Sequence, residues 1–305
     1  MDDFNESVQK LKDIFEKSKL KTDLMNKNVL IVLDEMIDRE TLLFEIAGIL
    51  NKNIDASIIF LQAVRGYYSR AEKIGKKLQA LPELIKKVKN KFSDRDDMFE
   101  VAFIPDEEIT PFERINQLIQ KRSVHIIVIP APFTSFAVEE DESESSLGIT
   151  VDRVLNEIFI PRKIPLMLIK VIENVQIPFT RIALFIREHP VDREIIGWIL
   201  ALAKKDARID IYHSEDLDRE SIEKTEIFCQ ACLDLMKKES REVIVEHYSE
   251  KFSLKGIFYE ISKNPGTLVV FQGLKDVNTD IKNVIRILNL WRVNILIFPP
   301  ITELT

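Results

Sequence analysis

The feature that most constrains this chain is a strict alternation of short apolar runs with segments of helical periodicity. The first two runs, NVLIVLD at 28–34 and ASIIFLQAV at 56–64, flank a helical pattern at 39–53. Short apolar runs predict buried strands, and apolar residues at spacings of three and four predict helices. Strands that alternate with helices form a parallel sheet with helices on both faces. The sequence therefore predicts an α/β fold.

The alternation continues to about residue 172. A long helical pattern steps from Ile74 to Phe92, with Pro82 as an expected kink. The remaining expected strands lie at 98–105, 124–130 and 165–172, with helices around 111–123 and 149–159 between them. The first set thus contains five strands and four helices.

The same order then restarts. The expected strands of the second set lie at 181–188, 209–215, 242–249, 266–272 and 293–300. The expected helices lie at 192–206, across the segment from Ile222 to Met236, at 253–264 and at 280–292. We therefore expect two doubly wound, five-stranded parallel-sheet domains in tandem. Their expected bounds are 27–174 and 178–305, after an N-terminal helical extension at 1–26.

The two sets align with offsets that shrink along the chain. Matching Asp-Arg-Glu at 38–40 with the same tripeptide at 192–194 gives an offset of 154, which places Glu188 on Asp34. The offset is 142 at the fourth strand and 129 at the fifth. Most of the second loss is an acidic loop, 139–146, that the second set lacks.

Composition excludes several classes of function. The net charge is −7 and the estimated pI is 5.4, and there is no dense basic stripe, so we expect no nucleic-acid ligand. The apolar stretch at 195–203 is shorter than the roughly 18 residues that span a bilayer. The N-terminus begins with acidic residues and has no apolar signal region, so we expect a cytoplasmic protein without membrane insertion.

The two cysteines form a C-x-x-C, Cys229 and Cys232, in the middle of a predicted helix. A redox pair needs its first thiol near a helix N-terminus, and zinc needs two further ligands. Both cysteines instead follow the apolar spacing of Ile222 and Met236. We therefore expect them to be buried, unreactive and free of metal.

Two segments resemble the universal stress protein family. They are the strand VLIVLD, which ends in Asp34, and the run LGITVDRVLNEIFIPRKIPLMLIK at 147–170. The resemblance covers about 27–174 and 178–300 and implies a Rossmann-like fold. In nucleotide-binding members, an aspartate ends the first strand, a small apolar residue ends the second, and a glycine loop after the fourth strand wraps the phosphates. By this resemblance, Asp34, Val64, Gly148 and Thr150 would line an ATP or AMP groove in the first domain.

The glycine loop departs from the family pattern. Ser135 and Val138 stand where the two leading glycines belong, and Thr150 follows Gly148 one place late. A glycine loop binds phosphate because its bare backbone lets several N–H groups converge on the oxygens. Here the loop carries five carboxylates, at positions 139, 140, 141, 142 and 144. We therefore expect ATP binding to be lost or weak, whereas adenosine or AMP needs no such cradle beside Asp34.

Other features leave alternatives open. Asp34 is either an adenine contact or the N-terminal residue of the next helix. Glu188 and His189 are either an acid–base pair or solvated strand-end residues. The loop 139–146, with its three serines, is a metal-binding or phosphorylated lid or a solvated loop.

The N-terminal extension carries an apolar stripe of Phe4, Val8, Leu11 and Phe15. This stripe docks either on a partner subunit, which would make a homo-oligomer, or on its own chain. Both fifth strands are apolar and end their sheets, so we expect them to be covered. In the resembling family, this edge commonly pairs with its counterpart, which implies a pseudo-twofold arrangement of the two domains.

Three functions remain. The first is a nonenzymatic regulatory or stress-response protein that acts through an unidentified protein partner. The second is an ATP or AMP sensor that uses the first domain. The third is a nucleotide-dependent enzyme of the same superfamily, for which the chain shows no S-G-G-x-D-S, H-x-G-H or Walker sequence.

Overall fold

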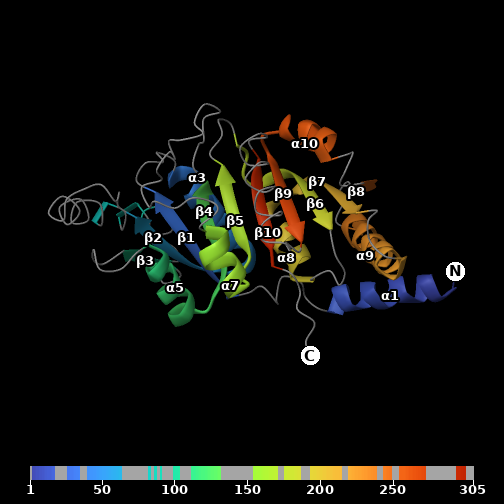
Figure 1. Cartoon of the computed structure of the whole chain (residues 1–305), viewed down its shortest axis with the longest axis horizontal. Coiled ribbons are helices and arrows are strands. Elements are labelled where there is room, and N and C mark those ends of the chain that lie inside the picture. Colours follow the sequence, from blue (N-terminus) through green and yellow to red (C-terminus); the bar gives the residue numbers. More distant parts are fainter. Residues whose placement is uncertain are drawn as a thin grey trace.

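The strands that the structure describes form one ten-stranded sheet, shown in a computed structural model (Figure 1). The structure describes residues 2–17, 26–34, 40–63, 82–83, 86–87, 90, 99–103, 111–131, 154–170, 175–186, 193–214, 219–238, 243–248, 254–272 and 293–299. The order of the strands is β3-β2-β1-β4-β5-β10-β9-β6-β7-β8. Each half of this order has the reversal that is typical of a doubly wound sheet.

The first half contains the elements expected from the sequence. They are α1 (Asp2–Lys17), β1 (Asn28–Asp34), α3 (Glu40–Ile54), β2 (Ser57–Ala63), β3 (Phe99–Phe103), α5 (Pro111–Arg122), β4 (Val124–Ala131), η2 (Leu155–Phe159), α7 (Ile160–Arg162) and β5 (Leu166–Lys170). All strand pairs within this half are parallel. Most of the expected helix at 74–92, including its kink, lies outside the described residues.

The second half repeats this order. Its elements are β6 (Phe179–Ile186), α8 (Arg193–Leu202), β7 (Ala203–Ser214), α9 (Arg219–Lys238), β8 (Val243–Tyr248), α10 (Leu254–Ser262), β9 (Thr267–Gln272) and β10 (Asn294–Phe298). Its strand pairs are also parallel. The expected helix at 280–292 lies outside the described residues.

The two halves join at their fifth strands. β5 and β10 pair antiparallel, with Met167 opposite Leu296. Every residue of both strands is buried, as expected for apolar edges that cover each other. The expected pairing of the two edges is therefore confirmed. The exact domain bounds, 27–174 and 178–305, stay a prediction, because strand pairing alone does not define folding units.

A second contact between the halves lies on one face of the sheet. There α3 packs against α8, and the Asn53 side-chain amide donates to the Ala201 carbonyl at 2.7 Å. Lys27, just before β1, forms an ion pair with Glu194 at 3.4 Å. The apolar faces of both helices belong to one cluster of buried residues that extends through both halves. The halves therefore share a core as well as a sheet.

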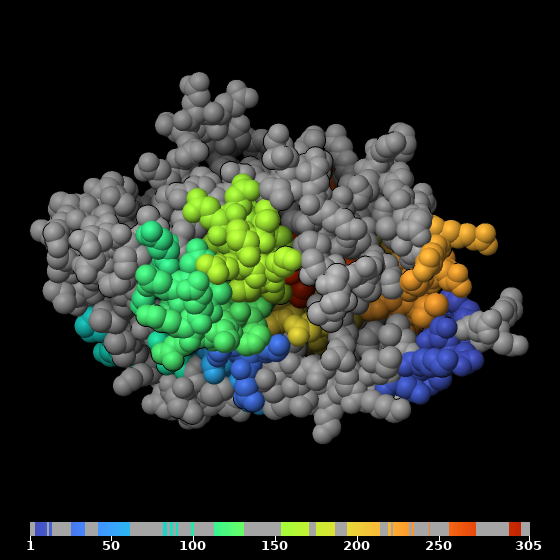
Figure 2. All heavy atoms as spheres, turned by 60° about the horizontal axis from the view of Figure 1, so that its bottom comes forward, coloured from blue at the N-terminus to red at the C-terminus, as the bar shows by residue number. Residues whose placement is uncertain are grey.

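The N-terminal helix docks on its own chain. α1 packs along α9, where Val8 is buried and Lys12 forms an ion pair with Asp234 at 2.9 Å. Figures 1 and 2 show α1 beside α9 at the far end of the second half. Of the two alternatives for the apolar stripe, the structure shows the intramolecular one. The side chains of Leu11 and Phe15 lie outside the described residues.

One helix boundary differs from the prediction. The helix expected at 192–206 ends at Leu202, and β7 begins at Ala203. The register with β6 then jumps, from Phe179 opposite Ala203 to Arg181 opposite Arg208. The intervening residues 204–206 are charged and exposed, so they bulge out of the sheet instead of extending the helix.

The strand register also corrects the alignment of the two halves. Leu30 pairs with Ile127 in the first half, and Ala183 pairs with Val269 in the second. Ile127 and Val269 are equivalent residues of the two fourth strands, 142 positions apart. Their partners Leu30 and Ala183 are therefore equivalent as well, and these two residues are 153 positions apart. The expected match of Glu188 with Asp34 is therefore wrong by one residue, because a helix alignment does not fix which face a strand residue occupies.

Among the helices that the structure describes, none is both long enough and apolar enough to cross a membrane.

Candidate functional site

The first candidate site is the reversal of strand order in the first half. β1 pairs with β2 on one side and with β4 on the other, so its carboxyl end lies at the point where the order reverses. Parallel sheets bind ligands outside the strand ends at this point. The first and fourth strands therefore flank the reversal.

The structure describes only part of the groove predicted there. Asp34 is the last residue of β1 and lies in register with Ala63 at the end of β2. Val64 follows Ala63 directly, but it lies outside the described residues, as do Gly148 and Thr150. The side chain of Asp34 and the acidic loop 139–146 are also outside them. The contacts of these residues with a ligand therefore stay a prediction.

A buried lysine stands beside this reversal, and sequence analysis missed it. Lys170 ends β5, is only 3% exposed and lies in register with Ala131 at the end of β4. Its backbone N–H donates to the Asn294 side-chain oxygen at 2.8 Å across the seam between the halves. Fully buried lysines are rare, so the run LMLIK did contain a signal. This signal can be interpreted only when it is known that β5 lies inside the sheet, between β4 and β10.

The helix that follows the acidic loop covers this part of the sheet. Val154, Leu155, Ile158 and Phe159 pack in one buried cluster with Leu166 and Leu168 of β5. Figure 2 shows the segments 111–131 and 154–170 side by side on one face of the molecule. Because side chains alternate along a strand, Lys170 is directed to the same face as Leu168. The lysine and this helix therefore share one face of the sheet.

The second candidate site is the reversal between β6 and β9. Ile186 lies between His213 of β7 and Gln272 of β9, and His247 continues the same row on β8. His213 is 1% exposed and Gln272 is 0% exposed, so neither reaches solvent in this structure. Glu188 and His189, the acid–base pair considered from the sequence, lie outside the described residues. Sequence analysis did not single out His213 or Gln272, because only the strand register brings them together.

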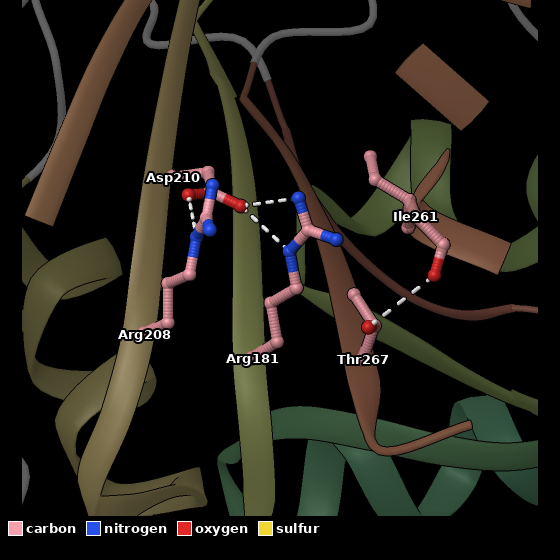
Figure 3. A network of polar contacts seen from close by, with 5 residues as sticks. All are labelled: Arg181, Arg208, Asp210, Ile261 and Thr267. Carbon is pink, nitrogen blue, oxygen red and sulfur yellow. Dashed lines mark hydrogen bonds and ion pairs between the residues drawn. The ribbon is translucent and has the colours of Figure 1, made fainter. Parts of the chain in front are cut away.

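A charged network lies on the other face of the second half. Asp210 of β7 is 0% exposed and accepts hydrogen bonds from Arg181 Nε and Arg208 Nε, both at 2.6 Å. Arg181 Nη2 also lies 2.6 Å from the same carboxylate. Figure 3 shows the two guanidinium groups approaching Asp210 from opposite sides. Arg181 and Arg208 are in register on neighbouring strands, which places both within reach of one carboxylate.

The amino end of the first-half sheet holds a partly buried histidine. His125 Nδ1 accepts the backbone N–H of Asn28 at 3.1 Å. Burial and the nearby positive charge of Lys27 lower the pKa of His125 from its usual range. Because Nδ1 accepts this hydrogen bond, the proton of the neutral ring lies on Nε2. This histidine lies at the end of the sheet opposite to Asp34, so it is not part of the predicted groove.

Cys229 is buried in α9, as predicted. Burial raises the pKa of its thiol to about 12, and the negative charge of Glu226 adds to the shift. A thiol with this pKa carries almost no thiolate at neutral pH. The side chain of Cys232 lies outside the described residues. Within the described part of the chain, no three His, Cys, Asp or Glu side chains are grouped as a metal site would require.

Comparison with solved structures identifies the fold. A universal stress protein from Archaeoglobus fulgidus matches with a TM-score of 0.59 and 15% identity, over 90% of this chain and 97% of that one. A candidate universal stress protein from Pseudomonas aeruginosa matches with a TM-score of 0.56 and 11% identity, over 92% and 94%. The cytoplasmic domain of a prokaryotic cation chloride cotransporter matches with a TM-score of 0.51 and 13% identity, over 90% and 96%.

Comparisons of sequence add nothing to this, since no protein-family model and no curated protein matches the chain. These three solved structures share less than 16% sequence identity with the chain, so the similarity shows the fold and not an activity. They cover 90–92% of this chain and therefore extend over both halves. The chain therefore has the universal stress protein fold over about nine-tenths of its length.

Proposed function

We propose that this chain is a nonenzymatic regulatory protein of the universal stress protein type that acts through contacts with another protein. The observation that carries this proposal is the seam between β5 and β10. The two apolar edges cover each other within one chain, so neither is needed for assembly with a second copy. In this proposal, the partner contacts helices on the outside of the single sheet.

The same proposal includes weak or absent ATP binding. The second half has one glycine, Gly273, in the connection after β9, which is too few for a phosphate cradle. In the first half, Ser135 and Val138 replace the leading glycines, and the acidic loop repels a triphosphate. Binding of ATP would then depend on a divalent cation that screens these carboxylates.

Calorimetric titration with ATP and magnesium tests this proposal. We expect no heat of binding at micromolar concentrations of ATP. Asp34→Ala is the matched variant, because by resemblance Asp34 makes the adenine contact. Micromolar affinity in the natural protein that is abolished by Asp34→Ala would contradict the proposal.

A second candidate function is a sensor of adenosine or AMP that uses the first half. It is favoured by the reversal of strand order at β1 and β4, because parallel sheets bind ligands outside the strand ends at such a reversal. The adenine contacts predicted at Asp34 and Val64 need no glycine loop. Titration with adenosine in the absence of magnesium distinguishes this function from a scaffold that binds no nucleotide.

A further inference from the structure

His125 lies at an irregular point of the sheet. At the amino end of β1, Asn28 pairs with Val124, but the next residue, Val29, pairs with Ile126. His125 is therefore an extra residue on β4 that has no partner position on β1. Such bulges are rare between parallel strands, so this one calls for a specific explanation.

The second half forms the same pair of strands without a bulge. There β6 pairs with β9 in unbroken register from Arg181, opposite Thr267, to Ile186, opposite Gln272. Thr267 lies 142 positions after His125 and is its equivalent on the other fourth strand. The fold therefore requires neither the extra residue nor a histidine at this position.

The imidazole ring of His125 holds the start of β1. Its Nδ1 accepts the backbone N–H of Asn28 at 3.1 Å. The side-chain amide of Asn28 donates to the Arg122 carbonyl, so the first residue of the strand is held on two sides. One of these two contacts thus depends on a ring nitrogen that can take up a proton.

The residue before Asn28 connects this point to other parts of the molecule. The carbonyl of Lys27 accepts the Ser57 N–H at 3.0 Å, at the start of β2. The ammonium group of Lys27 pairs with Glu194 of the second half at 3.4 Å. A displacement of Asn28 would therefore also affect β2 and the contact between the halves.

We propose that protonation of His125 releases the amino end of β1, so that this end of the sheet is an acid-sensitive switch. The neutral ring carries its proton on Nε2, and a proton from solvent adds to the lone pair of Nδ1. The imidazolium ring then has two N–H donors and no acceptor. The Asn28 N–H would face another donor, so the ring and the strand cannot both keep their positions.

The charges around His125 do not favour its protonated form. Burial, and after it the positive charge of Lys27, lowers the pKa of His125 from its usual range. Among the described residues, the nearby carboxylates are engaged elsewhere, since Glu194 pairs with Lys27 and Glu100 pairs with Arg122 at 2.9 Å. No ion pair with a carboxylate therefore compensates the charge of the protonated ring in the described part of the chain.

Acid should consequently destabilise the folded chain through this histidine. In the unfolded chain, His125 has its usual pKa of about 6.5. Because its pKa is lower in the folded chain, the unfolded chain binds more protons between the two values. The stability that depends on the neutral ring is complete above about pH 6.5 and is lost as the pH falls through the folded-state pKa.

The first test is urea denaturation of the natural protein and of His125→Asn, each at pH 8 and at pH 5. Asparagine places Oδ1 where histidine has Nδ1, so this variant can accept the Asn28 N–H but cannot take up a proton. Between pH 8 and pH 5, the unfolding equilibrium constant of the natural protein should rise roughly 2- to 10-fold more than that of the variant, the range of one net hydrogen bond. His125→Phe has no acceptor and should be less stable than the natural protein at pH 8.

Hydrogen exchange shows whether the strand itself opens. At pH 5, after correction for the intrinsic exchange rate, the natural protein should lose protection at residues 28–30, and His125→Asn should keep it. The matched control is the segment 181–183 of β6, which has no bulge and should stay protected in both proteins.

An NMR titration of the histidine Cε1–H signals measures the protonation directly. The signal that is absent from His125→Phe belongs to His125, and its midpoint in the natural protein should lie below about pH 6.5. If His125→Asn does not fold, His125→Gln takes its place as the neutral acceptor.

Three results would overturn the proposal. Equal pH dependence of the natural protein and His125→Asn would assign the acid sensitivity to other groups. Protection of residues 28–30 at pH 5, with His125 protonated, would leave the histidine a structural role only. A titration midpoint at or above about pH 6.5 would show that the folded chain does not disfavour the charged ring. None of these results depends on whether the chain binds a nucleotide or a protein partner.

Discussion

At the scale of single residues, the network around Asp210 shows a charge where the fold accepts an apolar side chain. Leu30 pairs with Ile59 in the first half, and the equivalent Ala183 pairs with Asp210 in the second. Ile59 therefore occupies the position of Asp210 and is buried like it. A buried ion pair is commonly no more stabilising than well-packed apolar residues. The fold therefore does not require a carboxylate at this position. Asp210 is needed because it neutralises the positive charges of Arg181 and Arg208.

This leads to a prediction about the removal of Asp210. Asp210→Ala should lower the free energy of unfolding by about 3 kcal/mol, because it leaves the largely buried Arg181 without its partner. Urea denaturation followed by circular dichroism measures the change. In the control, the double variant Arg181→Met with Asp210→Ile replaces this buried ion pair with two apolar side chains. It should recover most of the loss, and a double variant as unstable as Asp210→Ala would contradict this interpretation.

At the scale of elements, the helix before β5 shows how one proline changes local geometry. η2 is a π-helix in which the Ile160 N–H donates to the Leu155 carbonyl, five residues back. Pro161 follows directly and has no N–H, and its ring would clash with the carbonyl four residues earlier in an α-helix. The wider turn relieves that clash. The helix then ends at Lys163, which adopts a left-handed conformation with φ of 51°.

The docking of α1 on α9 is a second property of elements, and it can be tested at Val8. Val8→Asp places a charge in the buried contact and should detach α1 from α9. We expect faster proteolytic cleavage between α1 and β1, detected by mass spectrometry, and a loss of about 1–2 kcal/mol in unfolding free energy.

The matched control for this test is Asn5→Asp, which adds the same charge at an exposed position of α1. It should change neither the cleavage rate nor the stability. Equal cleavage rates in Val8→Asp and in the natural protein would show that α1 is held by other contacts.

At the scale of the whole molecule, the seam turns two repeated halves into one sheet. The offset of 129, read from the sequence alone, places Met167 on Leu296, and the structure pairs these two residues directly. The pseudo-twofold axis therefore passes between them. The contact of α3 with α8 lies beside the same axis. Disruption at this point should affect both halves together.

We predict that Met167→Asp lowers the free energy of unfolding by about 3 kcal/mol or more, because it buries a carboxylate without a partner at the centre of the seam. Urea denaturation monitored separately by circular dichroism and by tryptophan fluorescence measures this loss. The swap of Met167→Leu with Leu296→Met conserves volume and should change stability by less than about 1.5 kcal/mol. A stable Met167→Asp protein would show that the seam contributes little.

The sequence by itself determined the parts of this protein that depend on local periodicity. The alternation of strands and helices, the repeat, the apolar fifth strands and the burial of Cys229 all follow from spacings along the chain. Apolar edges at the ends of two sheets also predicted their pairing. The early end of α8 and the bulge after it were not predicted, because the apolar spacing of the helix continues past Leu202.

Only the tertiary structure decided which residues are neighbours across strands. Register placed Lys170 beside Ala131 and set Ile186 between His213 and Gln272. It also showed that Asp34 and Glu188 are not equivalent. Spacing along a chain cannot supply these relations, because a strand can shift by one residue against its neighbour without any change in its own pattern, and the shift moves every side chain to the other face.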